Sequence, residues 1–236
     1  MTTFLVAHGA WSAGWAWKKM HPLLAARGHA LVTPTLTGLG DRAHLAHAGI
    51  DLDHHIRDIL AVIDMEDLSA IALIGHSYGG MVATGVADRA RDRVARLIYL
   101  DAFAPRDGDS VFSLSAGPYV EERLKAAATE GDGWRLPPNP APPDTAPEDL
   151  AWINARRLPQ PLETFRQPLT MTGGPLTLPV DYIYAGRIGP GDRFRPFLRK
   201  AQDTEDWRAH EIDASHSPHV TAPEALAELL DSIVRS

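Results

Sequence analysis

Three residues of this chain, Gly75, Ser77 and Gly79, form the pattern Gly-x-Ser-x-Gly, which can present a serine as a nucleophile. An apolar run at 71–74 precedes the pattern, and a helix-forming segment follows it to about Ala90. In this setting the pattern predicts a nucleophile elbow, a turn so sharp that side chains at the two glycines would collide with neighbouring backbone. Such a turn lifts the serine hydroxyl above the carboxyl edge of a sheet, in front of a helix N-terminus. We therefore expect a nucleophilic Ser77 rather than a plain strand-to-helix turn.

A serine nucleophile needs a general base, which is most often a histidine. Of the eleven histidines, His216 is the best candidate, because it lies in a loop between the last expected strand and the last expected helix. That loop belongs to the same sheet edge as Ser77. We interpret His219 as a hydrogen-bonded loop residue and His8 as a structural residue of the first loop. His76 adjoins the serine, but neighbouring side chains on an elbow point apart.

A carboxylate must hold the tautomer of the base and stabilise its charged form. Asp192 is the preferred acid, because it follows the loop after the expected strand 180–185, and loops after parallel strands meet at one edge of the sheet. The rival acid is Asp101, which ends the strand after the elbow helix and faces the same edge. Asp213 is too close in sequence to His216 to orient it easily.

The attacked carbonyl also needs hydrogen-bond donors for the negative charge that develops on its oxygen, each worth about 3 kcal/mol. One expected donor is the backbone N–H of Tyr78 at the start of the elbow helix. A second comes from the loop after the first strand, where Gly9 permits close approach and Ala10 can supply an N–H. This loop could also be only a tight turn, but its match with the elbow favours an oxyanion hole.

Strands and helices that alternate along the chain must position these residues. Besides the elbow unit, we expect strands at 4–7, 30–33, 94–100, 180–185 and 208–212, and helices at 15–27, 53–65, 194–202 and 223–234. Repeated alternation of this kind predicts an α/β fold, with a mostly parallel, doubly wound sheet covered by helices on both faces.

The alternation breaks between residues 106 and 177. This stretch contains many prolines, which exclude a core strand or a long helix where they cluster: Pro137, Pro138, Pro140, Pro142, Pro143 and Pro147. A solvated linker is one interpretation. We favour a lid, inserted between two core strands where it can cover Ser77, so that residues 1–105 and 178–236 form the core.

Composition limits the classes of function. The chain of 236 residues has 44% hydrophobic residues, enough for a large core, and a formal charge of −7, which argues against nucleic acid or an anionic membrane as a partner. It contains no cysteine, so disulfides, thiolate metal sites and a cysteine nucleophile are excluded. Neither a signal peptide nor a membrane-spanning stretch is evident, and we expect a cytoplasmic protein. The oligomeric state stays open between a monomer and a homodimer.

Together these motifs resemble the α/β-hydrolase superfamily over nearly the whole chain. Within it, the chain is similar to the small-lid group of plant methyl esterases, hydroxynitrile lyases and related bacterial esterases. The motifs that carry the resemblance are His8-Gly9-Ala10-Trp11 with Trp15, Pro22-Leu23-Leu24 before Gly28-His29, the elbow run Gly75-His76-Ser77-Tyr78-Gly79-Gly80-Met81, Asp192 with Phe194 and Phe197, and His216 leading to Pro223. The resemblance implies a triad of Ser77, Asp192 and His216, with Ala10 and Tyr78 as oxyanion donors.

The chain departs from two branches of this group. The lyases carry a threonine after the first-loop histidine and a lysine after the catalytic histidine, where this chain has Gly9 and Ser217. The stretch 35–42 differs from the plant members, so their hormone-ester substrates do not carry over. We therefore expect a serine hydrolase without cofactor or metal, most simply a carboxylesterase that forms an acyl-enzyme from a small ester.

Five side chains are candidates for the substrate pocket, although aromatic residues often only fill a core: Trp11, Phe112, Leu114, Trp134 and Trp152. Two further classes of function remain open. One is lyase-like or other non-hydrolytic chemistry in the same pocket, such as a cofactor-free oxygenase. The other is a small-molecule binding protein on a hydrolase scaffold.

Overall fold

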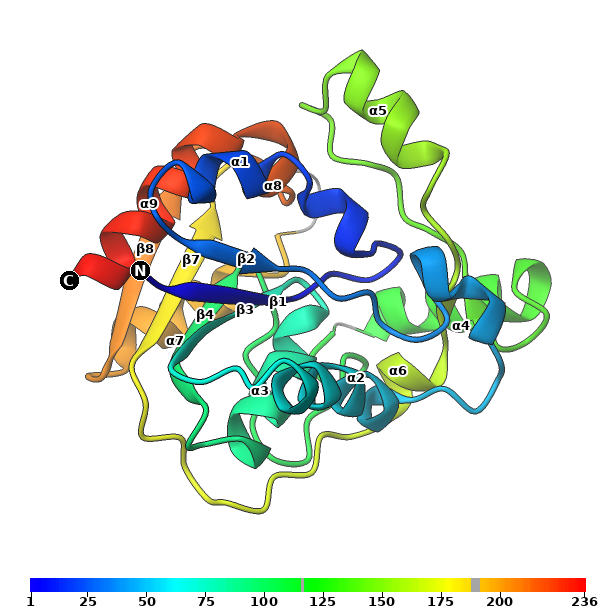
Figure 1. The fold of residues 1–236 in the computed structure, drawn as a ribbon. Helices are drawn as coiled ribbons and strands as arrows, with labels where there is room; N and C mark the ends of the chain where they lie inside the picture. The colour runs from blue at the N-terminus through cyan, green and yellow to red at the C-terminus, as the bar shows by residue number, and fades with distance from the viewer. Residues whose placement is uncertain (116, 188–191) are drawn as a thin grey trace.

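A parallel sheet of six strands forms the centre of the protein (Figure 1). The computed structural model describes residues 1–115, 117–187 and 192–236. In order across the sheet, the strands are β2 (Ala30–Val32), β1 (Thr3–Ala7), β3 (Ile71–His76), β4 (Val94–Leu100), β7 (Val180–Ala185) and β8 (Trp207–Ile212). Every neighbouring pair is parallel, which confirms the expected α/β class. The carboxyl ends of all six strands therefore meet at one edge.

Helices cover both faces of this sheet (Figure 1). One face carries α1 (Met20–Ala25) and α9 (Pro223–Arg235), which contact each other. The opposite face carries α2 (Leu52–Met65), α3 (Gly79–Arg89) and α7 (Arg195–Asp203). Shorter helices are η1 (Gly14–Trp17), η2 (Gly40–Leu45) and α8 (Pro218–Thr221).

The two hydrophobic layers follow from the alternation of side chains along each strand. In β1, Phe4 and Val6 join the layer under α1 and α9, whereas Leu5 and Ala7 join the layer under α2 and α3. All four side chains are fully buried. Strands that bury both faces read as continuous apolar runs, which is how they were recognisable in the sequence.

The expected strands and the helices α2, α3, α7 and α9 are confirmed to within one residue at each end, except that β3 extends two residues beyond the expected run 71–74. The expected helix 15–27 is wrong, because it divides into η1 and the short α1. Pro22 explains the division. It has no N–H to donate to a carbonyl four residues earlier, so it fits only the first turn of an α-helix, and α1 starts at Met20.

Residues 106–177, between β4 and β7, form what we call the inserted segment. Its elements are α4 (Gly117–Glu130), β5 (Arg135–Leu136), α5 (Pro147–Asn154), β6 (Gln160–Pro161) and α6 (Glu163–Arg166), and β5 pairs antiparallel with β6. In Figure 1 its helices α4, α5 and α6 lie beyond the carboxyl ends of the strands, with α5 projecting farthest from the sheet, and the stretch after α6 returns to the start of β7. Residues 137–146, which hold five of its eleven prolines, form neither helix nor strand.

Part of the inserted segment belongs to the core of the protein. Leu136, Leu162 and Phe165 are buried in the layer that also contains α2 and α3, and α6 contacts α2 directly. The inserted segment is therefore fixed to the sheet at its α6 end, although its α5 end projects.

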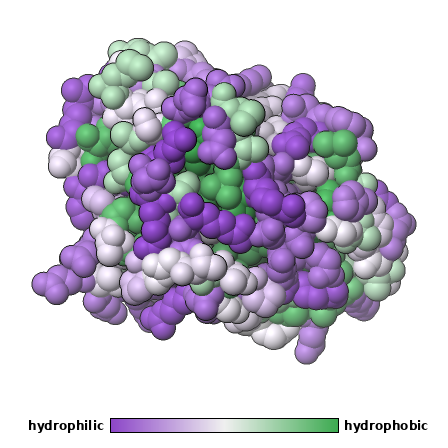
Figure 2. Space-filling view, turned by 60° about the horizontal axis from the view of Figure 1, so that its bottom comes forward, coloured by the Kyte–Doolittle hydropathy of each residue, from purple (hydrophilic) through white to green (hydrophobic). Residues whose placement is uncertain are grey.

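The face of the molecule shown in Figure 2 carries no large hydrophobic area. In the view of Figure 2, most surface residues are hydrophilic and hydrophobic ones show as small areas between them. Within the described part of the chain, no helix combines the length and the apolar character needed to cross a bilayer.

Candidate active site

Ser77 occupies a strained turn between β3 and α3, as the sequence predicts. Its backbone φ angle is +54°, in the left-handed region that residues other than glycine rarely adopt. A Cβ atom on Gly75 would lie 2.8 Å from the carbonyl oxygen of Gly79, and one on Gly79 would lie 2.0 Å from the carbonyl oxygen of Ala7. Backbone therefore fills the space on both sides of the serine, and the two flanking positions accept only glycine.

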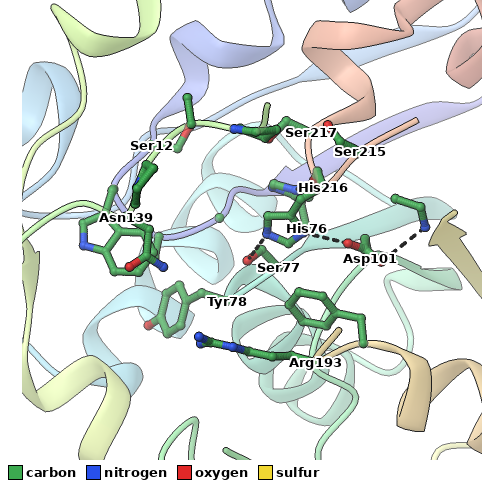
Figure 3. A pocket seen from close by; sticks show the side chains of 18 of the residues that line it. Ser12, His76, Ser77, Tyr78, Asp101, Asn139, Arg193, Ser215, His216 and Ser217 are labelled. Carbon is green, nitrogen blue, oxygen red and sulfur yellow. Dashed lines mark hydrogen bonds and ion pairs between the residues drawn. The ribbon is translucent and has the colours of Figure 1, made fainter. Parts of the chain in front are cut away.

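His216 bridges Ser77 and Asp101 (Figure 3). It lies between β8 and α8, where its Nε2 atom is 2.9 Å from the Ser77 hydroxyl oxygen and its Nδ1 atom is 2.7 Å from an Asp101 carboxylate oxygen. A carboxylate only accepts hydrogen bonds, so Nδ1 carries the hydrogen and Nε2 accepts from the serine. The three side chains form one chain of hydrogen bonds, from hydroxyl to imidazole to carboxylate.

Asp101 is the acid of this arrangement, which corrects the preference for Asp192. It follows β4, the neighbour of the strand that leads to Ser77, and its φ of +42° turns the side chain toward His216. Its second oxygen accepts a hydrogen bond of 3.2 Å from the backbone N–H of Ala185, at the end of β7. Asp101 is 4% exposed, and hydrogen bonds hold its carboxylate from two sides.

Asp192 binds other groups and does not contact His216. The Tyr184 hydroxyl donates to its carboxylate at 2.7 Å, and the backbone and side chain of Arg195 donate at 3.0 and 2.7 Å. Burial opposes ionisation, but these hydrogen bonds outweigh it and lower the pKa of Asp192 below its ordinary value. The Asp192 carboxylate thus accepts a hydrogen bond from the first backbone N–H of α7. Positions 188–191 of the preceding loop lie outside the described residues.

The first loop passes directly over the elbow. A Cβ atom on Gly9 would lie 2.8 Å from His76 Nδ1 and 3.2 Å from Ser77 Cβ, so only glycine permits this approach. Ala10 and Tyr78 flank the serine on this side, and within the described residues neither backbone N–H donates to a protein acceptor. Both amides are thus available where the sequence predicts an oxyanion hole.

His8 fixes the orientation of this loop. Its Nδ1 atom donates to the carbonyl of Gly9 at 2.8 Å, and its Nε2 atom accepts from the backbone N–H of Leu36 at 3.0 Å. Burial lowers the pKa of His8 to about 4, which keeps it neutral and suited to both bonds. In a trans peptide the C=O and the N–H point in opposite directions, so holding the Gly9 carbonyl points the Ala10 N–H away from His8.

Trp11 ties the first loop to the inserted segment. Its backbone N–H donates to the side-chain oxygen of Gln160 at 3.2 Å, and its indole N–H donates to the carbonyl of Leu136 at 2.8 Å. Gln160 is fully buried, and its amide nitrogen donates to the hydroxyl of Thr164. No motif marks Gln160 in the sequence, because its partner is far away along the chain.

His76 and His219 stand behind His216. His76 Nε2 donates to the backbone carbonyl of His216 at 2.7 Å, so it points away from Ser77, as expected, and supports the histidine loop. His219 stacks on Trp17 with ring centroids 4.5 Å apart, and burial lowers its pKa to about 3. Its Nδ1 atom has no hydrogen-bond partner among the described residues, so His219 is a packed residue rather than the hydrogen-bonded one we expected.

A cavity of about 640 Å³ opens over Ser77. Trp11 lines it, as the sequence predicts, whereas the other four pocket candidates do not. Phe112 packs edge-on against Phe165 with centroids 6.0 Å apart, Trp152 packs edge-on against Trp15 at 5.0 Å, Leu114 packs against the core, and the guanidinium of Arg135 covers Trp134. These apolar side chains hold the inserted segment in place instead of facing the substrate space.

Other side chains of the inserted segment form the outer wall of the cavity. They are Tyr119, Glu122, Arg123, Asn139, Ile153, Arg157 and Phe165, together with the prolines 140, 142 and 143. Phe194 completes the wall from the core and stacks on His216, with centroids 4.9 Å apart. The wall is more polar than we expected from the aromatic candidates.

Comparison with known proteins places this geometry in a family. The model of the alpha/beta hydrolase family matches residues 4–229. The chain belongs to the alpha/beta hydrolase family. This hydrolase is 38% identical over 242 residues to the carbendazim hydrolyzing esterase of Nocardioides sp. (strain SG-4G), an alignment that covers 99% of the hydrolase and 100% of that esterase. It is 28% identical over 253 residues to the pyrethroid hydrolase of Sphingobium wenxiniae, covering 98% and 86% of the two chains.

A solved structure agrees with this placement at the level of the fold. An extracellular alpha/beta-hydrolase from a Paenibacillus species superposes with a TM-score of 0.85 at 24% identity, over 98% of each chain. Similarity to esterases along the full chain makes the hydrolase a carboxylic ester hydrolase, which confirms the activity expected from the sequence.

Proposed function

We propose that Ser77, His216 and Asp101 are the catalytic triad with which the protein hydrolyses a small carboxylic ester through an acyl-enzyme. The observation that supports this proposal best is the continuous chain of hydrogen bonds from the Ser77 hydroxyl through His216 to Asp101. The strained backbone of Ser77 presents that hydroxyl to the cavity, where a substrate carbonyl can approach it.

In the first half of the reaction, His216 Nε2 takes the proton of the Ser77 hydroxyl while its oxygen attacks the ester carbonyl carbon. The tetrahedral intermediate then breaks its bond to the alcohol oxygen, which receives the same proton from His216. In the second half, water gives a proton to His216 and attacks the acyl-enzyme. The acid leaves, and Ser77 regains its proton. Asp101 keeps the hydrogen on Nδ1 and stabilises the imidazolium throughout.

The negative charge on the carbonyl oxygen requires the two N–H donors of Ala10 and Tyr78. His8 supports this assignment, because it fixes the Gly9–Ala10 peptide in one orientation. Tyr78 is the N-cap residue directly before α3, so the positive end of the helix dipole adds to its donor. The donors are set before substrate arrives, which is the condition for strong stabilisation of a transition state.

The inserted segment acts as the lid of this site. Its side chains form the outer wall of the cavity, whose volume suits a small molecule rather than a polymer. Carbendazim and pyrethroids are natural first candidates as substrates, because relatives that align with nearly the full chain are named for hydrolysing them.

Two measurements test the proposal. A fluorophosphonate probe should label Ser77, as peptide mass spectrometry can show, and the wild type should hydrolyse short p-nitrophenyl esters. Ser77→Ala should keep the fold and lower kcat by about 10⁴-fold or more. Near-normal turnover by Ser77→Ala, or labelling confined to another residue, contradicts the triad.

A further inference from the structure

Among the described residues, four arginines line the cavity, and Arg187 is paired with Asp213. The other three are Arg123 in α4, Arg157 just after α5, and Arg193 just before α7. In Figure 3, Arg193 extends across the cavity on the Tyr78 side of Ser77, opposite Ser215 and Ser217. The chain as a whole carries a formal charge of −7, so a concentration of positive charge at one wall of the cavity is not a property of the general surface.

Shared contacts connect the three guanidinium groups. Arg193 stacks on the ring of Tyr119 at 3.3 Å from its centroid, and Arg123 lies 5.7 Å from the same centroid. Arg123 donates to the side-chain oxygen of Asn139 at 2.7 Å, and Arg157 donates to the backbone carbonyl of Asn139. We call Arg123, Arg157 and Arg193 the arginine cluster.

Among the described residues, no carboxylate forms an ion pair with the arginine cluster. Other charged groups at the cavity have partners: Asp101 pairs with His216, Asp192 with Arg195, and Arg187 with Asp213. Within the described residues, no carboxylate lies within 4.0 Å of a cluster guanidinium, and Ala116 and residues 188–191, which are not described, include no acidic side chain. Glu122 is the one lining acid among the described residues that is left to oppose three positive charges.

Burial makes this arrangement costly unless an anion joins it. Arg157 is partly buried, and the loss of water lowers the pKa of its guanidinium to about 10, so it stays charged at neutral pH. Like charges gathered in a partly dry cavity repel one another, and the repulsion is stronger there than in water. Guanidinium groups bind carboxylates with two parallel hydrogen bonds, which removes this cost.

The arginine cluster also lies close to the reaction centre. The guanidinium carbon of Arg157 is 5.7 Å from the centroid of the Trp11 ring, and Trp11 follows directly the oxyanion residue Ala10. A group bound by the cluster can therefore belong to the same small molecule whose ester carbonyl reaches Ser77.

We propose that the arginine cluster binds a carboxylate of the substrate, so that the preferred esters are half-esters of dicarboxylic acids. This inference rests on the proposed ester hydrolysis. The reaction consumes one water and turns the half-ester into the dicarboxylate and the free alcohol, with the second carboxylate unchanged. Arg123 and Arg157 also brace Asn139, whereas Arg193 has only the aromatic contact with Tyr119 among the described side chains.

The test compares monomethyl with dimethyl esters of succinate, glutarate, adipate and suberate, by titration of the released acid. The wild type should show a higher kcat/KM for the half-ester at the chain length that spans Ser77 and the cluster. Arg157→Gln and Arg193→Gln should each lower kcat/KM for that half-ester by about tenfold, and for the diester by much less. Glu122→Gln should raise the preference for the half-ester.

Arg156→Gln is the matched control. Arg156 adjoins Arg157, is exposed, donates to the carbonyl of Trp152 and does not line the cavity, so its replacement should leave both ester series unchanged. Arg193→Gln guards against misfolding of the Arg157 variant, because Arg193 is exposed.

Three results overturn the inference. If the wild type hydrolyses diesters at least as well as half-esters at every chain length, the cluster does not select a carboxylate. If Arg157→Gln and Arg193→Gln lower both series by the same factor, the arginines only support the fold. If the wild type hydrolyses neither series and Ser77 resists the fluorophosphonate, the ester hydrolysis itself fails, and the inference fails with it.

Discussion

A carboxylate can orient a catalytic histidine only when the protein holds the carboxylate as well. Asp101 meets this condition, since one oxygen accepts from His216 and the other from the backbone of Ala185. Its left-handed backbone costs about 1–3 kcal/mol, which the surrounding contacts must offset. Ser77 and Trp11 carry the same kind of strain, so three strained residues gather around one cavity.

Exchange of the acid tests this arrangement. Asp101→Asn should lower kcat for p-nitrophenyl acetate by about 10⁴-fold, because an amide beside Nδ1 favours the wrong tautomer of His216. Asp192→Asn is the control. It should lower the free energy of unfolding by only about 1 kcal/mol, because the first N–H of α7 then has a weaker acceptor. Steady-state kinetics and urea unfolding of both variants decide the matter, and the opposite ranking in kcat would return the acid role to Asp192.

Gln160 should affect the rate more than the binding of substrate. Gln160→Ala removes the acceptor of the Trp11 N–H, and the loop that carries Ala10 loses one of its supports. We expect kcat to fall by about tenfold or more and KM to change less, since the lost support matters most in the transition state.

Two further variants separate this effect from general destabilisation. Gln160→Glu keeps an oxygen in the same position and should retain more activity than the alanine variant. Thr164→Val removes the other partner of Gln160 but leaves the bond to Trp11 intact. A fall in kcat for Thr164→Val as large as that for Gln160→Ala would show that the effect comes from packing alone.

The choice of the acid shows where prediction at the scale of residues stops. Ser77 and His216 stand out because a glycine pattern and a loop position mark them. Asp101 and Asp192 both follow strands that end at the same edge, and nothing in their spacing distinguishes them. The decision depends on a left-handed backbone angle at Asp101 and on bonds from Tyr184 and Arg195 that hold Asp192 elsewhere. Such contacts between distant residues leave no mark in a single sequence.

Hydrophobic periodicity in the sequence predicts the strands and helices of the core, but it does not predict the short strands of the inserted segment. β4 and β7 are apolar runs with the predicted bounds. By contrast, β5 and β6 have two residues each, which is too short for any hydrophobic period to show. The sequence also does not indicate which way the aromatic side chains of the inserted segment point, so the prediction that Phe112 lines the cavity is wrong: it packs on Phe165.

The helix α5 offers a matched pair for the specificity of the inserted segment. Ile153 lines the cavity, whereas its neighbour Trp152 does not line it and packs on Trp15. Ile153→Ala should enlarge the space for the acyl chain and so change the ratio of kcat/KM between octanoate and acetate p-nitrophenyl esters. The change should correspond to about 1–3 kcal/mol of activation free energy. Trp152→Ala should leave that ratio unchanged. Equal chain-length profiles for the wild type and Ile153→Ala would remove α5 from the specificity of the enzyme.

At the scale of the whole molecule, buried histidines should make the fold sensitive to acid. Burial lowers the pKa of His8 and His55 to about 4 and of His219 to about 3, below the ordinary value of 6.5. Between these values the unfolded chain binds more protons than the folded one. Stability should therefore be complete above about pH 6.5 and fall as the pH falls, by up to about 1.4 kcal/mol per pH unit for each histidine.

Urea unfolding from neutral pH down to about pH 4 measures this slope. His219→Phe keeps a ring that can stack on Trp17 but removes one titrating group, and it should reduce the slope. His44→Gln, at an exposed position of η2, should leave the slope unchanged. A wild-type midpoint that does not vary between pH 6.5 and pH 4 would contradict this account.

The two hydrogen bonds of Trp11 make access to the cavity and readiness for reaction depend on each other. They join the loop that carries Ala10 to Leu136 and Gln160, in β5 and β6 of the inserted segment. Leu136 and Leu162 anchor this part of the inserted segment in the core, so any opening of the cavity that moves β5 and β6 must either break these bonds or move the loop with them. In both cases Ala10 loses its fixed position while the cavity is open. The Ala10 N–H is then in position for the reaction only when β5 and β6 close the cavity. A molecule that keeps the cavity open would slow the reaction without contacting Ser77.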